Sequence, residues 1–97
     1  MIYGTNRLYY PSGEVAVAQV VETADGYVVA ITPFVCEIHS MVWYDTIFLC
    51  SKLYKKQLFA SIIDLHTLLA DDTVVSSPLY AYGVNFDGGC CLFEPLR

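Results

Sequence analysis

The chain has 97 residues, of which 56% are hydrophobic and 15% are charged, and its formal net charge is −5. This length fits a single domain over residues 1–97 and excludes a (β/α)₈ barrel, which needs roughly 250 residues. The apolar share and the low charge also exclude an intrinsically disordered chain. A chain this short buries only about 60–65% of its unfolded surface. We therefore expect part of the apolar excess to form a self-associating surface.

The balance of charges argues against nucleic acid or an anionic membrane surface as a partner. Ten acidic residues outnumber five basic ones, and the isoelectric point is about 4.6. The one basic cluster, Lys52, Lys55 and Lys56, is typical of a solvated face rather than of a patch that displaces counterions. The first residues do not resemble a signal peptide, and no apolar stretch approaches the roughly 18 residues that span a bilayer. We predict a cytoplasmic protein.

The first third of the chain predicts three strands, over residues 2–10, 14–23 and 27–32. A Pro-Ser-Gly turn at 11–13 separates the first two. Asp25-Gly26 separates the second and third, and this dipeptide is typical of a tight hairpin because Gly accepts a positive φ. Both alternate faces of the second strand are mostly apolar, which predicts burial on both sides.

The middle of the chain changes its hydrophobic period. Residues 34–49 are rich in β-branched and aromatic side chains, which favours strand, with a break near His39 and Ser40. Residues 53–72 instead predict an amphipathic helix, because apolar residues recur at the helical spacing. The stripe consists of Leu58, Ile62, Leu65 and Leu69. The competing interpretation is two strands with a bend near Ser61.

Residues 73–94 predict C-terminal strands, over 73–75, 79–86 and 90–93, with a hairpin turn at 87–89. The predicted fold class is mainly β (α+β), either an antiparallel β-sandwich or a partly open barrel with one amphipathic helix. Strands that do not close into a full barrel leave edges, and exposed edges pair with other chains.

The four cysteines do not predict a metal site. Cys36 and Cys50 are far apart in the sequence, and Cys90 and Cys91 are adjacent, so no C-x-x-C motif is present. Neighbouring strand residues point to opposite faces and do not easily chelate one metal. We interpret the cysteines as buried, reduced thiols that act as small apolar residues.

Few groups in the chain are suited to catalysis. His66 lies beside the apolar stripe of the predicted helix, where a histidine is typically a boundary residue. Glu37 and His39 fall on the same side of a predicted strand and are weak candidates for an acid–base pair or two metal ligands. Neither a G-x-S-x-G motif nor a phosphate-binding loop is present. We expect no catalytic residue, no cofactor and no metal centre.

The aromatic residues are the other candidate functional group, because the chain contains eight tyrosines. A tyrosine combines an apolar ring with a polar tip, which suits a subunit contact or a ligand groove. The alternative is core packing with the hydroxyl at the surface. The candidate interface or groove residues are Tyr9, Trp43, Tyr44, Tyr80 and Tyr82.

Residues 2–49 resemble a known domain in their order of strands and turns. The relevant runs are Asn-Arg-Leu-Tyr-Tyr-Pro-Ser-Gly at 6–13, Val-Val-Glu at 20–22 and Asp-Gly-Tyr-Val-Val at 25–29. They resemble the small β-sandwich, or composite domain, that flanks the catalytic barrel of amidohydrolases such as imidazolonepropionase. The chain is also similar to short bacterial proteins, typical of gut Bacteroidales, that consist of this domain alone and carry a segment like residues 33–39 leading to Trp43.

The resemblance implies the fold but not the hydrolase activity. In amidohydrolases the strand that enters the barrel carries a Pro-Gly start, an acidic residue and a His-x-His metal pair. Pro33, Glu37 and His39 match three of these positions, whereas Phe34 replaces the Gly and Met41 replaces the second His. A hydrolytic metal centre generally needs at least three protein ligands, and the barrel that would supply the others is absent from this sequence.

These observations lead to one preferred function and two alternatives. We expect a small non-catalytic β module that forms a homo-oligomer or binds a partner protein. The first alternative is an accessory or remnant part of a metal-dependent amidohydrolase, a C–N hydrolase, using Glu37 and His39. The second is a small-molecule-binding domain that uses the tyrosine-rich strands.

Overall fold

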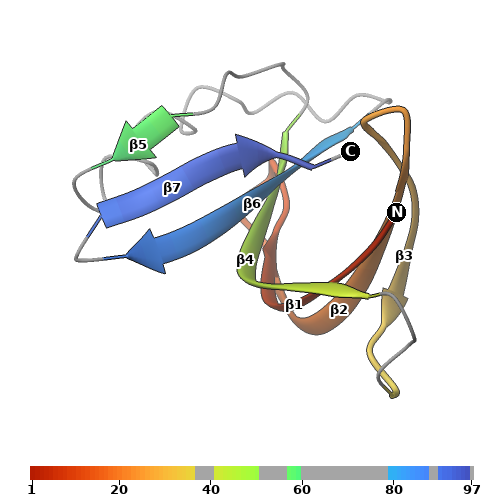
Figure 1. Cartoon of the computed structure of the whole chain (residues 1–97). Coiled ribbons are helices and arrows are strands. Elements are labelled where there is room, and N and C mark those ends of the chain that lie inside the picture. The colour runs from red at the N-terminus through yellow and green to blue at the C-terminus, as the bar shows by residue number, and fades with distance from the viewer. Residues whose placement is uncertain (37–40, 51–56, 60–78, 88–89, 97) are drawn as a thin grey trace.

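The computed structural model describes residues 1–36, 41–50, 57–59, 79–87 and 90–96, and within them it shows seven strands in one sheet and no helix (Figure 1). The strand order across the sheet is β3-β2-β1-β4-β6-β7-β5. The strands are β1 (Ile2–Tyr9), β2 (Val15–Ala24), β3 (Tyr27–Pro33), β4 (Val42–Cys50), β5 (Gln57–Phe59), β6 (Tyr80–Asp87) and β7 (Cys90–Pro95). The prediction of a mainly β fold is confirmed.

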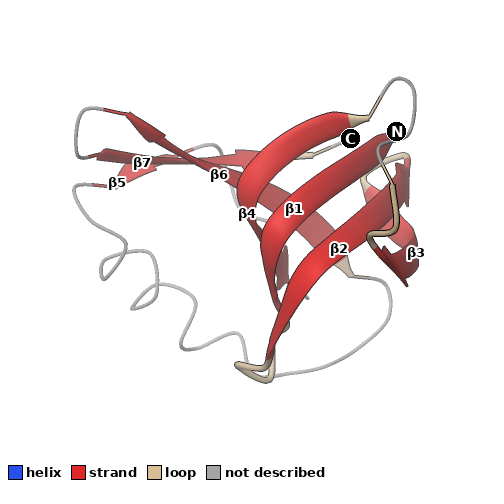
Figure 2. Cartoon of the chain, turned by 90° about the horizontal axis from the view of Figure 1, so that it is seen from below, coloured by secondary structure: helices blue, strands red, loops and turns tan. Residues whose placement is uncertain are grey.

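The sheet curls into a partly open barrel rather than dividing into two layers. It curves so far that β3, at one edge, reaches β6 and pairs with it at Tyr27 and Tyr80 (Figure 2). Of the two predicted architectures, the partly open barrel therefore describes the molecule and the sandwich does not. The prediction of an antiparallel sheet needs one correction, because β1 pairs with β4 in parallel.

Most predicted strand boundaries lie within two residues of the observed ones, and the turn chemistry explains this agreement. Asp25 and Gly26 have φ values of 55° and 86°. Two consecutive positive φ angles are characteristic of the type I′ turn, whose twist matches that of the flanking strands. This turn fixes the β2–β3 hairpin, with Ala24 opposite Tyr27.

The helix predicted over residues 53–72 is wrong where the structure describes it. Residues 57–59 form β5, which pairs antiparallel with β7 and places Leu58 opposite Leu92. Leu58 is 69% exposed instead of facing a core. The edge of β7 offers unpaired backbone groups to an extended segment, and this tertiary pairing outweighs a helical period in the sequence. The rest of the predicted helix and the predicted strand at 73–75 lie outside the described residues.

The first half of β2 is also more exposed than predicted. Val15 and Val17 are 42% and 72% exposed, whereas Val20 and Val21 are both buried. Side chains of a regular strand alternate between a buried and an exposed face. Burial of both Val20 and Val21 therefore shows that this alternation changes along β2, between Val17 and Val21. Ala18 has a φ of 53° and lies at this point. Such a left-handed residue reverses the pattern of faces, which the sequence period does not reveal.

The sheet bends at one level across three adjacent strands. Asn6 of β1 is not paired with either neighbouring strand. The residues opposite it, Ala18 on β2 and Asp45 on β4, are likewise left out of the pairing with β1. The fully buried Thr5 hydroxyl donates to the carbonyl oxygen of Arg7 at 2.9 Å and lies 3.2 Å from that of Asp45. The Asn6 amide donates to the Asp45 carboxylate at 3.1 Å. The Thr5 hydroxyl thus supplies a donor to backbone carbonyl groups where the ladder is interrupted, and the sharp turn of β4 is visible in Figure 1.

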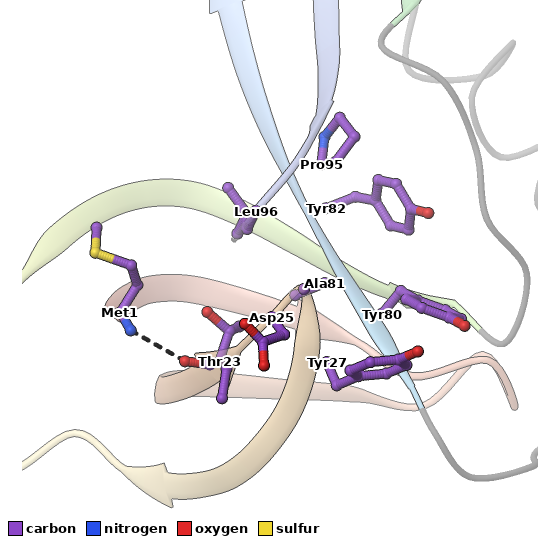
Figure 3. Close-up of a pocket in the computed structure, with 11 residues that line it drawn as sticks. Met1, Thr23, Asp25, Tyr27, Tyr80, Ala81, Tyr82, Pro95 and Leu96 are labelled. Atoms are coloured by element: carbon purple, nitrogen blue, oxygen red, sulfur yellow. Dashed lines mark hydrogen bonds between the residues drawn. The ribbon is translucent and has the colours of Figure 1, made fainter.

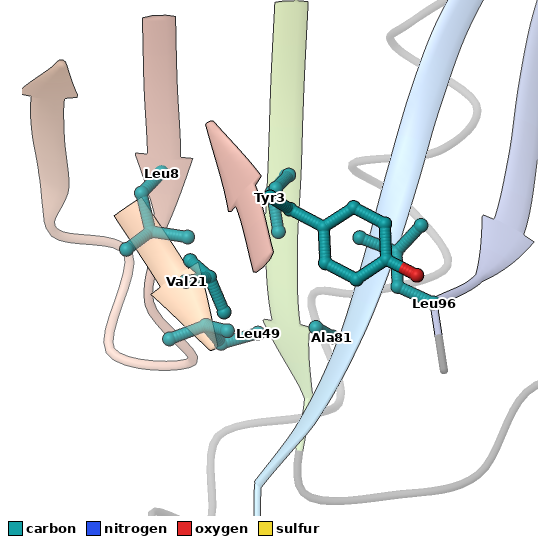
Figure 4. Packing of buried hydrophobic residues seen from close by; sticks show 7 residues of the cluster. Tyr3, Leu8, Val21, Leu49, Ala81 and Leu96 are labelled. Atoms are coloured by element: carbon teal, nitrogen blue, oxygen red, sulfur yellow. The ribbon is translucent and has the colours of Figure 1, made fainter. Parts of the chain in front are cut away.

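Buried side chains form two clusters on opposite faces of the sheet. Alternate residues of β4 belong to different clusters, as the strand period requires. The first cluster, inside the curl (Figure 4), consists of Tyr3, Leu8, Val21, Ile47, Leu49, Ala81 and Leu96. The second consists of Phe48, Cys50, Tyr82, Val84, Cys91 and Phe93. The second half of β4 is therefore buried on both faces.

We expect Leu8→Ala to lower the free energy of unfolding by about 2–5 kcal/mol, because Leu8 is fully buried and its removal leaves a cavity. The matched control is Val17→Ala, at a 72% exposed position on the neighbouring strand, which should cost less than about 1 kcal/mol. Chemical denaturation measures both. Equal losses in the two variants would contradict the assignment of Leu8 to the core.

Candidate functional site

A cleft of about 780 Å³ lies where the barrel closes (Figure 3). Its walls come from the β2–β3 turn, the start of β6 and the end of β7 with Leu96. The side chains that matter most for its chemistry are Thr23, Asp25, Tyr27, Tyr80, Pro95 and Leu96. This volume lies within the range of about 300–1,000 Å³ that is usual for small-molecule sites.

The cleft exists because β3 and β7 share one edge of β6. At the start of β6, the Val28 nitrogen donates to the Leu79 carbonyl oxygen at 2.9 Å. Farther along, β7 pairs with β6, and the Leu96 nitrogen donates to the Ala81 carbonyl oxygen at 2.9 Å. The opposite edge of β6 is occupied by β4. Since β3 and β7 meet β6 at different points and then separate, a gap opens between them.

Two tyrosines form one wall of this cleft. The ring centroids of Tyr27 and Tyr80 lie 5.2 Å apart, with the planes inclined by 36°. Desolvation by burial raises the pKa of the Tyr80 hydroxyl, and its coulombic interaction and hydrogen bond with Tyr27 act in the same direction. The Tyr80 hydroxyl therefore keeps its proton throughout the neutral pH range and remains available as a donor.

The polar groups of the cleft lie near the hairpin turn. Asp25 is exposed, and it lies between the tyrosine pair and Met1 in Figure 3. The Met1 nitrogen donates to the Thr23 carbonyl oxygen at 3.0 Å. The Thr23 hydroxyl oxygen is buried and has no hydrogen-bond partner among the described residues. The cleft thus combines an apolar wall with a carboxylate and an unsatisfied hydroxyl.

A second candidate site is the outer edge of β3. The Phe34 nitrogen donates to the Ala18 carbonyl oxygen at 2.9 Å. Because backbone groups alternate along a strand, the N–H of Thr32 points to β2, while the N–H and C=O of Ile31 point away from it. After the pairing of Tyr27 with Tyr80, the described residues supply no strand on that side of β3. Val29 on this segment is 57% exposed.

Further exposed apolar residues lie where β3 ends and β4 begins. Val35 is 88% exposed and Trp43 is 43% exposed. The rings of Phe34 and Trp43 meet edge to face, with centroids 5.4 Å apart. Trp43 lies over Gly4, where an added Cβ atom would be 2.4 Å from its ring. The glycine therefore gives the indole a place against the outer surface of β1.

Two of the predicted interface tyrosines are packing residues instead. Tyr9 stacks on Phe48 with centroids 4.6 Å apart and an angle of 13°. Tyr82 is 1% exposed and stacks on Phe93 at 4.7 Å and 9°. Tyr82 also borders the cleft. The structure therefore favours the core-packing alternative for Tyr9, and for most of the Tyr82 ring.

Tyr44 is held by a specific polar contact. Its hydroxyl donates to the Glu94 carboxylate at 3.0 Å, and its ring lies over Gly83, where an added Cβ atom would be 2.5 Å away. Desolvation raises its pKa to about 12, with further contributions from Glu94 and Tyr3. Of the five predicted residues, Tyr80 and Tyr82 reach the cleft, whereas Tyr9, Trp43 and Tyr44 lie elsewhere.

The structure does not describe the polar candidates from the sequence. Glu37, His39 and His66 lie outside the described residues. Within the part of the chain that the structure describes, no three histidine, cysteine or acidic side chains approach closely enough to hold a metal. Cys50 and Cys91 are buried as predicted, but Cys36 is exposed because it follows the end of β3. Among the described residues no helix could cross a membrane.

Sequence reasoning missed Asp25 and Tyr27 as site residues, and it did not locate the open edge. The available signals were the Asp25-Gly26 turn and the absence of charge from residues 27–33. Neither signal shows that β3 returns to β6, because that contact depends on the curl of the whole sheet.

No protein-family model, curated protein or solved structure matches the chain. The geometry of the cleft and of the β3 edge is therefore the basis for proposing a function. The resemblance of residues 2–49 to the amidohydrolase composite domain stays a prediction.

We expect Glu94→Gln to lower the pKa of Tyr44, because it removes the carboxylate that disfavours the tyrosinate. The pKa should stay above 10, since desolvation is the largest cause of the shift. A raised folded-state pKa stabilises the protein fully below pH 10, and this contribution is lost as the pH rises toward 12.

NMR titration of ¹³C-labelled tyrosine rings measures this pKa. Glu22→Gln, at an exposed carboxylate on β2, is the matched control and should leave Tyr44 unchanged. The same Tyr44 pKa in wild type and Glu94→Gln would contradict the importance of this contact.

Proposed function

We propose that the chain is a non-catalytic interaction module that self-associates by pairing the open edges of β3. The observation that carries this proposal is an edge of β3 that no strand of the described residues covers and that contains no charged residue. Residues 29–33, which follow the contact with β6, read Val-Ala-Ile-Thr-Pro. Monomeric proteins usually protect such an edge with charges, bulges or covering segments.

The backbone supports strand addition at this edge. The N–H and C=O of Ile31 point outward, and pairing with another strand would satisfy both groups. Pro33 lacks an N–H and ends the pairing surface. The exposed Val29 side chain adds apolar area next to the backbone contact. A strand that adds here gains backbone hydrogen bonds and side-chain contacts together.

The proposed occupant is a second copy of the same chain. The whole molecule carries a net charge of −5, so two copies repel each other across most of their surfaces. The uncharged β3 edge is a place where they can approach without opposing like charges. Antiparallel pairing of β3 with itself gives a closed two-fold dimer in which both edges are covered. Cross-strand contacts between β-branched side chains would stabilise it further.

The proposal agrees with the partners and the cytoplasmic location predicted from the sequence. Its acidic character disfavours nucleic acid and anionic membranes as partners. Buried Cys50 and Cys91 behave as apolar core residues, which suits the predicted reducing cytoplasm.

We expect sedimentation equilibrium to show an apparent mass that rises from 10.8 kDa toward twice this value with concentration. A small edge contact suggests a Kd on the order of micromolar to tens of micromolar. Val29→Lys should weaken the dimer by at least about tenfold, because it removes an apolar contact and places like charges near the two-fold axis.

Val17→Lys is the matched control, since Val17 is also an exposed valine but lies on β2, opposite Arg7 of β1 and outside the stretch of β2 that pairs with β3. Both variants change the net charge equally, so a difference between them reports on the edge. A wild-type monomer up to about a hundred micromolar would contradict the proposal. So would an equal effect of the two variants.

A further inference from the structure

We propose that the cleft between β3, β6 and β7 binds a small organic cation, an ammonium group attached to an apolar or aromatic body. This site is separate from the self-association edge, which begins beyond the Tyr27–Tyr80 pair. Three features of the described residues carry the inference: the apolar lining, the aromatic pair and the carboxylate at the hairpin turn.

The apolar part of the cleft suits the body of such a ligand. Ala81, Pro95 and Leu96 lie along it. In Figure 3, Ala81 is on β6, and Pro95 and Leu96 are at the end of β7. Ala81 and Leu96 are both buried members of the first hydrophobic cluster, so the packing of that cluster fixes this side of the cleft. A preformed apolar surface binds a ligand without a large ordering cost.

The aromatic pair suits the positive charge. Tyr27 is 41% exposed, and its ring lies beside that of Tyr80 with 5.2 Å between the centroids. The face of an aromatic ring carries negative electrostatic potential and attracts ammonium groups. The bridge between β3 and β6 fixes the backbone beneath both rings, so the wall is organised before a ligand arrives.

The carboxylate supplies the charge preference. Asp25 borders the cleft, and among the described residues that line it there is no lysine, arginine or histidine side chain. The Met1 nitrogen, the other charged group at the cleft, donates to the Thr23 carbonyl oxygen. The buried Thr23 hydroxyl is a further acceptor beside the turn that lacks a partner among the described residues. An ammonium group can donate to both kinds of oxygen.

Isothermal titration with three probes of the same size tests this inference. Benzylammonium, benzyl alcohol and benzoate share the aromatic body and differ in charge. We expect benzylammonium to bind about fivefold tighter than benzyl alcohol, as is typical of a partly exposed ion pair. Benzoate should bind most weakly of the three. NMR shifts at Tyr27 and Tyr80 would locate the bound probe.

Asp25→Asn should reduce the affinity for benzylammonium to that for benzyl alcohol. Asparagine tolerates the positive φ of this turn position, so the variant should fold. Glu22→Gln makes the same change in net charge at an exposed site outside the cleft, and it should bind benzylammonium like the wild type.

Three results would overturn the inference. Equal effects of the two variants would show that only the overall negative charge attracts the probe. Tighter binding of benzoate would show that the Met1 amine dominates the cleft. Shifts confined to residues away from Tyr27 and Tyr80 would place the probe elsewhere. The lining of the cleft does not include Val29 or Ile31 of the proposed self-association edge, so these readouts do not test whether the β3 edges pair.

Discussion

The single pairing between β3 and β6 is the constraint on which the candidate sites depend. It joins the sheet into a barrel at one end, through Tyr27 and Tyr80 and the hydrogen bond from Val28 to Leu79. Because the pairing stops there, no strand of the described residues covers the rest of this edge of β3. The cleft has the same origin, because β3 and β7 meet one edge of β6 at different points and then separate. One incomplete closure therefore accounts for both the proposed contact surface and the proposed ligand site.

The closure stays incomplete for a reason that lies in β6 itself. Each edge of a strand offers one row of backbone groups, and β4 occupies one edge of β6. On the other edge β7 pairs with β6 from Tyr82 to Asp87. This leaves β3 only the first residue. The register shift between Glu22 and Thr23 on β2 also marks a local irregularity of the β2–β3 hairpin, and such irregularities increase twist. The bend at Asn6, Ala18 and Asp45 adds to the curl that brings the hairpin to β6.

Much of the fold could be predicted from the sequence, because local turn chemistry determines where its hairpins form. Asp25-Gly26 predicted the β2–β3 hairpin, and the β-branched content predicted most strands. The parallel pairing of β1 with β4 could not be predicted, since it joins segments about forty residues apart and leaves no local signature. The left-handed Ala18 was equally hidden, because alanine rarely adopts this conformation. The helical period around Leu58 was misleading, since a sheet edge can recruit a short apolar segment.

The candidate site was less predictable than the fold. Tyr80 was identified from its residue type, but its partner Tyr27 was not, because only the curl of the sheet places them together. Tyr9 and Tyr82 stack on core rings, although Tyr82 also borders the cleft, and the sequence left both core packing and a groove open for them. Aromatic content alone does not distinguish these roles. The amount of ring surface that neighbouring strands cover decides between them.

Amide hydrogen exchange along β3, followed by NMR in protein dilute enough to be monomeric, tests the central claim most directly. The account predicts slow exchange for the Val28 amide, which donates to Leu79, and for the Thr32 amide, which faces β2. The Ile31 amide between them should exchange rapidly, because it points to the open edge. Protection of Ile31 equal to that of Thr32 in the monomer would contradict the account.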